Sequence, residues 1–489
     1  MTRILEDNSS PRSWAWCSIG DIGEVITGTT PSKKVYRYYG NDFPFYKPAD
    51  LDRGFIISSS EDGLSKEGAK VARLLPETTV LVTCIGKIGK VSITSVKAAS
   101  NQQINAIVPI SETVSSKYLG YVLLSPAIQN EMRINASATI LPILNKSKFE
   151  KIRIPICSMN EQKRIISKIE EIFTRLDVGI DSLKKAKIQL KRYRQSVLKA
   201  AFEGKLTEEW RKHNTNEIES NSILLANIRK HGKSLDTDSN HMDNDIVLGT
   251  TSYPARWPLA NLPEIGELKR GMSKHRPRDD KMLYGGPYPF IQTGDIRNSK
   301  GIIKNFTQTY SELGLKQSKL WPEGTLCITI AANIAETAIL GIEACFPDSI
   351  VGFVPNRTIC NAKFIHFFIQ SIKRKLESYA PATAQKNINV GILSRLPVPI
   401  PCLLEQEQIV GLLEDQFSII DNLAVTIDQT LNGATILRQS VLTEAFRGKL
   451  ISQDPNDEPA GKLLEMIREE KSKLAEQTIL QVQPGSGGK

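Results

Sequence analysis

The sequence predicts a mixed α/β fold of the α+β type, in which two similar globular domains alternate with two long helices. Three observations predict it. The 489-residue chain repeats itself, each copy begins with short β-rich runs, and each copy ends in about forty residues with a seven-residue apolar period. The length gives each copy enough residues for a hydrophobic core of its own.

The internal repeat aligns residue 161 with residue 405, an offset of 244 residues. Residues 161–206 and 405–450 align without a gap and share 16 identities in 46 positions. Unrelated sequences of average composition would share roughly three. Upstream the match is looser, as between FPFYKPADL (43–51) and YPFIQTGDI (288–296). We infer that the later segments serve something common to both copies, while the earlier segments handle something that differs.

The variable segments, residues 1–157 and 253–401, predict two mixed α/β domains. β-rich runs at 79–84, 91–94 and 104–109 have counterparts at 325–330 and 350–355, and turn-rich stretches separate them. Helices are expected at 116–130 and 362–378. Each domain should therefore contain a small twisted sheet covered by a helix.

The better-preserved segments, residues 158–212 and 402–452, predict long helices that pair as a coiled coil. Pro155 and Pro401 precede them, and Gly204 and Gly448 stand where a helix would stop. A helix of about forty residues would be roughly 60–65 Å long. The alternative is two surface helices of ordinary domains. The apolar positions expected in the coiled-coil core are Ile169, Leu176, Leu183, Leu190, Val197, Leu413, Ile420, Ile427 and Val441.

Opposite charge on the two helices favours pairing within the chain. Residues 161–206 contain 12 Lys+Arg and 6 Asp+Glu, whereas residues 405–450 contain 3 and 7. The sequence alone does not fix the direction of the pair. We favour an antiparallel pair, which would relate the two globular domains by a pseudo-twofold axis. A polar linker (213–252) and a tail with a short helix (453–489) complete the chain.

Composition favours a polyanionic partner and a reducing compartment. There are 63 Lys+Arg against 53 Asp+Glu, a net charge of +10. The seven cysteines form no CxxC pair, and no apolar stretch is long enough to span a membrane, so we expect a cytoplasmic protein. MTRILEDNSSPRSW at the start has no apolar segment of the kind found in secretory signals.

Basic and amide side chains cluster in the predicted loops of both globular domains. Lys and Arg neutralise phosphates, and Arg, Lys, Asn and Gln also bond to base edges, so these loops favour DNA binding, although each loop alone could be a solvated turn. Asp50 and Asp295, at equivalent positions, could accept from a cytosine amine or stabilise a turn. The candidate DNA-binding residues are Thr29, Thr30, Lys33, Lys34, Lys47, Lys87, Lys90, Gln102, Gln103, Asn145, Lys146, Lys269, Arg270, Lys274, Arg276, Arg278, Gln292, Asn333, Lys386 and Asn387.

Motifs for catalysis or cofactor binding are missing from the sequence. It has no GxxxxGK[ST] phosphate loop, no GxGxxG, no nuclease-like acidic cluster and no histidine pair with metal-ligand spacing. We therefore expect a binding and scaffolding protein that carries no catalytic or metal site.

Together, the conserved segments resemble the specificity (S) subunits of type I restriction-modification systems. The resemblance covers nearly the whole chain. It is carried by IRIPICSMNEQKRIISKIE (152–170) and LPVPIPCLLEQEQIVGLLE (396–414), each a proline-containing lead-in followed by Glu-Gln and heptads. RYRQSVLKAAFEGKLTEEWR (192–211), RQSVLTEAFRGKL (438–450) and DPNDEPAGKLLEMIREEK (454–471) extend it.

The resemblance implies a non-catalytic subunit with two target-recognition domains. Each would read one half of a bipartite, asymmetric DNA target, and the paired helices would set the spacer. Two modification subunits would dock on the helices and methylate adenine, and restriction subunits would add ATP-dependent cleavage. S-adenosylmethionine, ATP and Mg are expected on those partners and no cofactor on this chain. The alternative is a coiled-coil scaffold without direct base readout.

Overall fold

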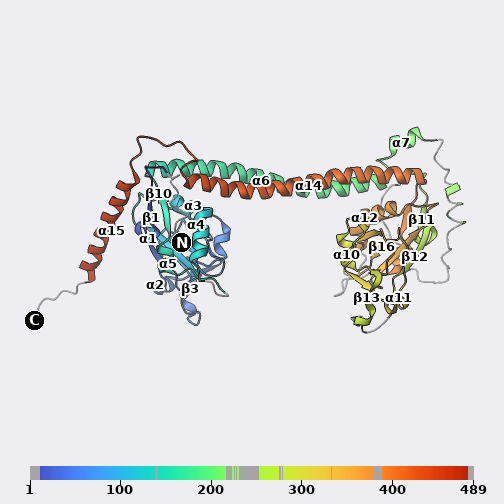
Figure 1. Ribbon diagram of the computed structural model, residues 1–489, viewed down its shortest axis with the longest axis horizontal. Coiled ribbons are helices and arrows are strands. Elements are labelled where there is room, and N and C mark those ends of the chain that lie inside the picture. The colour runs from blue at the N-terminus through green and yellow to red at the C-terminus, as the bar shows by residue number, and fades with distance from the viewer. Residues whose placement is uncertain are drawn as a thin grey trace, which may run out of the picture. The chain divides into compact units, whose positions relative to one another are not determined.

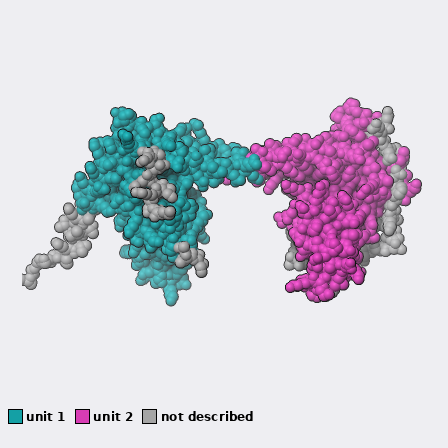
Figure 2. All heavy atoms as spheres, in the orientation of Figure 1, with its two compact units in different colours: residues 1–183, 428–489 teal, residues 184–427 magenta. Residues whose placement is uncertain are grey.

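The computed structural model forms two compact units, residues 1–183 with 428–489 and residues 184–427 (Figure 2). It describes residues 11–137, 141–215, 223, 224, 226, 228, 230, 253–274, 277, 279–331, 333–378 and 388–482. Most of the predicted linker (213–252) therefore lies outside the described residues. Each unit holds one globular domain together with parts of both long helices.

The N-terminal globular domain is built on a five-stranded sheet with the order β2-β9-β6-β7-β4. Its strands pair antiparallel except for β4 with β7. A second sheet has the order β5-β3-β8, and β1 pairs with β10. The elements are β1 (Ala15–Ser18), α1 (Ile19–Ile22), β2 (Gly23–Thr27), η1 (Tyr36–Tyr38), β3 (Tyr39–Tyr46), η2 (Asp50–Arg53), β4 (Ile56–Ile57), β5 (Asp62–Leu64), α2 (Lys66–Val71), β6 (Val80–Thr83), β7 (Val91–Thr94), β8 (Ala99–Ser100), β9 (Ile104–Pro109), α3 (Ser116–Leu124), α4 (Pro126–Asn135), α5 (Lys146–Glu150) and β10 (Arg153–Ile156).

The C-terminal globular domain repeats this topology. Its five-stranded sheet has the order β12-β18-β16-β17-β14, again with one parallel pair, β14 with β17. β13 pairs with β15, and β11 with β19. The elements are β11 (Leu259–Asn261), α9 (Leu262–Ile265), β12 (Gly266–Arg270), η3 (Lys281–Leu283), β13 (Tyr284–Phe290), α10 (Thr293–Asn298), β14 (Ile302–Ile303), β15 (Gln308–Tyr310), α11 (Glu312–Lys316), β16 (Leu326–Thr329), β17 (Thr337–Leu340), β18 (Ile350–Pro355), α12 (Ala362–Ser378), α13 (Val390–Ser394) and β19 (Pro397–Pro399).

The predicted strands lie within a residue of those found, but one predicted helix is divided. The helix expected at 116–130 is two helices, α3 and α4, which meet at Ser125. Pro126 is the first residue of α4, and Ser125 before it is extended, with ψ 145°. Proline disfavours the helical conformation of the preceding residue, so the helix breaks there. The helix expected at 362–378 is continuous as α12.

Two long helices, α6 (Met159–Phe202) and α14 (Leu403–Phe446), each contain 44 residues (Figure 1). In the second unit Arg194 bonds to Asp421, while Thr207, just past the end of α6, bonds to Glu405 near the start of α14. Residues later in α6 and just after it therefore contact residues earlier in α14. The segments run antiparallel, as expected. A short helix, α7 (Glu208–His213), follows α6.

An arginine clamp joins the two helices in the second unit. The Arg194 guanidinium lies 3.9 Å from the centroid of the Phe417 ring, and its Nη1 donates to Asp421 at 2.7 Å. The ring and the carboxylate both belong to α14, so one α6 side chain makes a cation–π contact and an ion pair across the interface.

The same clamp recurs in the first unit with the helices exchanged. Arg438 of α14 lies 4.7 Å from the centroid of the Phe173 ring and pairs with Asp177 of α6. These three residues are the repeat equivalents of Arg194, Phe417 and Asp421, and all three pairs are identities in the alignment. The duplication has therefore kept a three-residue contact that pairs the helices.

Of the two heptad rows in the long helices, one is well covered along its length. The predicted core residues Ile169, Val197, Leu413, Ile420, Ile427 and Val441 are buried, and Leu176, Leu183 and Leu190 are half-buried. The other row is open in the middle, where Tyr193 is 51% and Leu423 is 48% exposed. That row also contains Gly179, Gln416 and Thr430, which cannot build a continuous apolar layer.

A buried carboxylate joins the long helices to the globular domain in the second unit. Glu405 is 1% exposed and accepts three hydrogen bonds. The donors are Trp257 Nε1 at 2.9 Å, Thr207 Oγ1 at 2.7 Å and Arg211 Nη1 at 2.6 Å. They come from the start of the globular domain and from the chain after α6. Three segments remote in sequence thus meet at one charge, which we call the Glu405 junction.

The first unit has the equivalent junction at Glu161. This carboxylate is 1% exposed and accepts from Trp14 Nε1 at 2.9 Å and from Gln453 Nε2 at 2.7 Å. Nearby, Arg164 of α6 pairs with Asp457 at 2.5 Å. The tail after α14 is in this way tied to the N-terminal domain.

The tail continues into α15 (Ala460–Val482), a 23-residue helix that is longer than the short helix predicted. Its first turn is bound to the N-terminal domain, because the Ala460 amide donates to the Ser13 carbonyl at 2.8 Å. Leu463 and Ile467 are buried in the core of that domain. The start of α15 therefore belongs to the folded body of the first unit.

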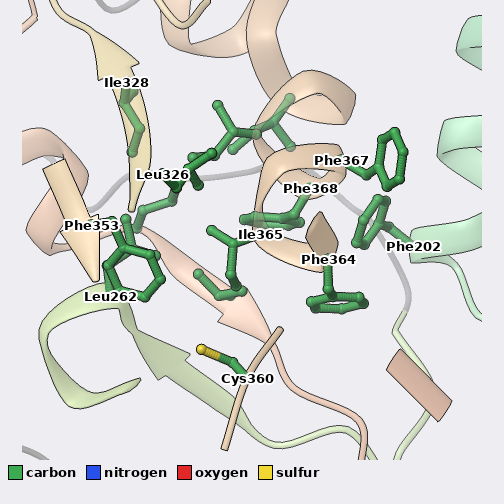
Figure 3. Close-up of a cluster of buried hydrophobic side chains, with 14 of the residues drawn as sticks. Phe202, Leu262, Leu326, Ile328, Phe353, Cys360, Phe364, Ile365, Phe367 and Phe368 are labelled. Atoms are coloured by element: carbon green, nitrogen blue, oxygen red, sulfur yellow. The ribbon is translucent and has the colours of Figure 1, made fainter. Parts of the chain in front are cut away.

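The core of the second unit includes the long helices. Phe202 of α6 lies 5.2 Å from Phe364 and 5.3 Å from Phe368 of α12, measured between ring centroids (Figure 3). Phe367 meets Phe417 of α14 edge-on at 5.5 Å. Because aromatic side chains bury large areas, the helices and the globular domain of this unit form one hydrophobic core.

We expect Glu405→Ala to destabilise the second unit by about 3 kcal/mol, because it leaves the half-buried Arg211 and the buried Trp257 indole without their carboxylate partner. The matched control is Glu407→Ala on the exposed side of the same helical turn, which should change stability by about 0.5 kcal/mol or less. The midpoint of thermal unfolding measures both effects. Equal midpoints for the two variants would contradict the role of the junction.

His366 of α12 is buried and neutral. It is 6% exposed, and its Nδ1 and Nε2 lie 2.9 Å from Thr337 Oγ1 and Gln370 Nε2. Burial, followed by the positive charges of Arg194 and Lys363, lowers the pKa of His366 to about 4. The unfolded chain would bind this proton near pH 6.5. The contribution of His366 to stability is therefore complete above pH 6.5 and is lost as the pH falls toward 4.

We expect His366→Gln to remove this pH dependence. The free energy of unfolding of the wild type, relative to that of the variant, should fall by on the order of 2 kcal/mol between pH 7 and pH 4.5. Chemical denaturation at the two pH values measures the difference, and the carboxylates common to both proteins cancel. A difference that is the same at both pH values would contradict a neutral buried histidine.

Candidate nucleic-acid interface

One edge of the N-terminal sheet gathers most of the loops that the sequence singled out. β2 and β6 end at Thr27 and Thr83, while β7 and β9 begin at Val91 and Ile104. Because these neighbouring strands are antiparallel, the four ends lie at the same edge. The loops 28–35, 84–90 and 101–103 leave the sheet there.

Hydrogen bonds hold these loops together. Thr30 Oγ1 donates to Gln102 Oε1 at 2.5 Å, and the Cys84 amide donates to the Gln103 carbonyl at 2.8 Å. The Leu144 amide donates to the Cys84 carbonyl at 2.8 Å and brings in the 141–148 segment. The structure therefore gathers the predicted residues Thr29, Thr30, Lys33, Lys34, Lys87, Lys90, Gln102, Gln103, Asn145 and Lys146 at one edge, which we call the N-terminal loop edge.

Several of these side chains already have structural partners. Lys90 Nζ donates to Asp52 at 2.5 Å and to the Pro48 carbonyl at 3.0 Å, and Lys47 pairs with Asp62. Asn145 caps α5 by accepting from the Lys148 amide, and Lys146 pairs with Glu150 at 3.5 Å. The exposed side chains at this edge include those of Thr30, Lys33, Lys34, Lys87 and Gln102.

Asp50 and Asp295 both stabilise turns, which is one of the two roles predicted for them. Asp50 is buried, and its Oδ2 accepts from the Lys47 amide at 2.8 Å. Asp295 Oδ2 accepts from the Gln292 amide, also at 2.8 Å and also three residues earlier. The equivalent geometry in the two domains explains the shared aspartate.

A hollow of about 540 Å³ opens beside the 86–90 loop. Besides that loop it is lined by Gln129, Arg133, Ala136 and Pro142. Gln129 Nε2 donates to the Gly89 carbonyl at 2.8 Å, so α4 supports the loop. Gln129 and Arg133 were not predicted as site residues. They lie on α4, about forty residues after the loop in sequence, and no sequence motif connects that helix with the loop.

The C-terminal domain presents the equivalent edge. β12 and β16 end at Arg270 and Thr329, and β17 and β18 begin at Thr337 and Ile350. Lys269, Arg270, Lys274 and Asn333 lie at this edge or in the loops that leave it, and Gln292 follows β13. The predicted residues Arg276, Arg278, Lys386 and Asn387 lie outside the described residues.

Some basic side chains at this second edge are also partnered. Lys269 Nζ lies 2.5 Å from Glu267, and Arg270 Nε donates to the Asp348 carbonyl. Gln292 Nε2 donates to Gln308 Oε1 at 2.5 Å, and both residues line a hollow of about 580 Å³. Lys274 is exposed, and its amide is held by Gln317 Oε1 at 2.6 Å.

The chemistry of the two edges suits an anionic polymer with hydrogen-bonding groups. Lysine ammonium groups can neutralise phosphates, and the amide side chains can donate to and accept from base edges. Within the described ranges, no group of three or more His, Cys, Asp or Glu side chains could hold a metal ion. Among the described helices, none is long and apolar enough to cross a bilayer.

The family comparison decides the identity of both copies. A family model described as the type I restriction modification DNA specificity domain matches residues 11–192 and 254–432. The chain belongs to this family. The two matched segments begin at Pro11 and Pro254, the prolines that pack against Gly448 and Gly204 at the helix ends. The domain has thus been duplicated together with its junction.

Similar proteins include other specificity subunits. The EcoBI specificity subunit of Escherichia coli is 24% identical over 479 residues, which cover 94% of this chain and 93% of that protein. The HindI specificity subunit of Haemophilus influenzae is 35% identical over 168 residues, which cover 33% of this chain and 36% of that protein.

Two solved structures share the fold. A chain from a structure concerned with complex assembly and conformational transition of the type I R-M system has a TM-score of 0.66 at 16% identity, covering 90% of this chain and 99% of that one. The HsdS subunit from Thermoanaerobacter tengcongensis has a TM-score of 0.54 at 16% identity, covering 92% and 100%. These two structures show the shared fold. The match of both segments to the DNA specificity domain makes the chain a specificity subunit of a type I restriction-modification system, with two DNA-recognition domains and a helical region.

We expect Lys87→Gln to weaken DNA binding several-fold and to lower the slope of log affinity against log salt by about 1, because one phosphate contact is lost. Lys97→Gln is the matched control, since Lys97 is also exposed but follows β7, at the opposite edge of the same sheet. Fluorescence anisotropy over a salt series measures both variants. A larger effect at Lys97 would exclude the loop edge as the DNA contact.

Proposed function

We propose that the two globular domains each read one half of a bipartite, asymmetric DNA target and that the paired helices fix the spacer between the halves. The observation that carries this proposal is the contrast within the repeat. The arginine clamp and the tryptophan–glutamate bond of each junction are duplicated with their side chains, whereas the loop edges differ in sequence. A common framework with two different loop edges is what two different half-sites require.

We also propose the partners and the division of chemistry. Two modification subunits dock on the helical regions and methylate adenine in each half-site, with S-adenosylmethionine bound on those subunits. Restriction subunits add ATP- and Mg-dependent cleavage, and this chain contributes no catalysis. The duplicated helices support two docking events of the same kind, because each copy presents the same helical motif.

Methylation inside a duplex supports a further division of labour. An enzyme that acts on a base in duplex DNA must rotate that base out of the stack. The loop edges offer lysines and amides that would hold the surrounding backbone and bases. The recognition domains would thus hold the DNA while the modification subunit receives the extruded adenine.

The proposal predicts how a longer helical pair changes the target. We would insert one extra heptad into α6 after Asp181 and another into α14 after Gly433, positions that match in the antiparallel register set by Asp177 and Arg438. Seven residues add about 10.5 Å, the rise of about three base pairs. Both half-sites should keep their bases, and the spacer should lengthen by about three base pairs.

Mapping of methylated adenines by long-read sequencing, in cells that express the variant with its modification subunit, measures the outcome. A heptad inserted into α6 alone is the control and should abolish methylation, because it displaces the two helices from one another. Altered half-site bases with an unchanged spacer would overturn the division between domains and helices. Exchange of a globular domain with no change in the methylated sequence would instead favour a scaffold without base readout.

A further inference from the structure

The second half of α6 carries an unusual concentration of positive charge. Residues 184–202 contain seven Lys and Arg and no Asp or Glu. Five of these seven side chains are exposed. Lys199 pairs with Glu203, and the other four are Lys184, Lys185, Lys191 and Arg192. Lys184 and Lys191, like Lys185 and Arg192, are seven residues apart, so all four lie on one face of the helix. We call these four residues the basic stripe.

Helix pairing does not use the basic stripe. In the second unit Arg194 of α6 bonds to Asp421 of α14, and the Tyr193 hydroxyl bonds to Gln416. In the part of the chain that the structure describes, the four stripe side chains make no ion pair. The opposite net charges of the two helices are therefore not matched residue by residue at this face.

The repeat shows that the framework does not need these charges. The positions equivalent to Lys184, Lys185, Lys191 and Arg192 are Asp428, Gln429, Thr435 and Ile436. The clamp arginine, by contrast, is present in both copies, as Arg194 and Arg438. Like charges three or four residues apart, such as Lys187 and Lys191, also oppose helix formation. The stripe is therefore best explained by something outside the chain.

We propose that the basic stripe binds backbone phosphates of the nonspecific DNA between the two half-sites. The proposal rests on the bipartite reading of the target proposed above, and it gives the helical pair a DNA contact of its own. Phosphate contacts suit a spacer because they position a protein without reading sequence. The stripe lies in the second unit only, so the contact belongs to the part of the spacer next to the half-site read by the C-terminal domain.

Spacing and composition favour duplex DNA over an acidic protein surface. The two rungs of the stripe are about 10.5 Å apart along the helix, close to the rise of three base pairs, and a duplex offers a phosphate charge about every 1.7 Å. Lysine is depleted in the cores of protein–protein interfaces. Three of the four stripe residues are lysines.

The experiment uses the complex of this chain with its modification subunit and compares wild type with the variant K184Q/K185Q/K191Q/R192Q. On unmodified DNA we expect the variant to bind about tenfold more weakly or worse, and its salt slope to fall by about 3 to 4. On DNA whose spacer phosphates next to this half-site are neutral methylphosphonates, wild type should lose the same affinity. The variant should bind this DNA no more weakly than it binds unmodified DNA, because the substitutions and the methylphosphonates remove the same contact.

A charge-keeping variant, K184R/K185R/K191R/R192K, is the matched control and should bind unmodified DNA like wild type. Unchanged DNA affinity of the glutamine variant would overturn the proposal. So would a loss of assembly with the modification subunit at unchanged DNA affinity per assembled complex, which would indicate an acidic protein partner. The bipartite target itself is tested separately, because the glutamine variant should methylate the same half-sites with the same spacer, only at higher protein concentration.

Discussion

The structure of each unit depends on one buried carboxylate, Glu161 in the first and Glu405 in the second. A charge that is 1% exposed is tolerated only when hydrogen-bond donors surround it. At Glu405 the donors are an indole, a hydroxyl and a guanidinium from two segments far from α14 in sequence. Satisfying this charge therefore forces the globular domain, the start of one long helix and the end of the other to fold together.

The glutamine that follows each glutamate extends the same constraint into the domain. Gln406 donates to the Ile359 and Pro401 carbonyls and accepts from the Asn361 amide, which precedes α12. Gln162 donates to the Thr113 and Cys157 carbonyls and accepts from the Ser115 amide before α3. The Glu-Gln pair of the repeat is thus the structural link between helix and domain, which accounts for its presence in both copies.

Much of the fold was predictable from local pattern, and the parts that were missed depend on contacts between distant residues. Heptads and β-rich runs report the periodicity of single elements, so the long helices and the main strands could be placed. Trp14 and Trp257 could not be recognised as partners of Glu161 and Glu405, because a lone tryptophan carries no periodic signal and its partner lies about 150 residues away. The heptad row predicted as the coiled-coil core is apolar throughout, whereas Gly179, Gln416 and Thr430 interrupt the open row.

At the candidate site too, local sequence predicted the loops, while contacts between distant residues decide which of their side chains are engaged. The sequence could name loops rich in lysine and amide, but not which side chains were already engaged, since Lys90 and Asp52 are 38 residues apart. Loop backbones at the N-terminal edge are joined by main-chain bonds such as that from the Cys84 amide to the Gln103 carbonyl, while Lys33, Lys34 and Lys87 extend into solvent. Substitution of such exposed side chains costs little stability. The loop edges can therefore vary in sequence without loss of the framework. A change at Glu405, by contrast, would disturb the contact between the long helices and the globular domain.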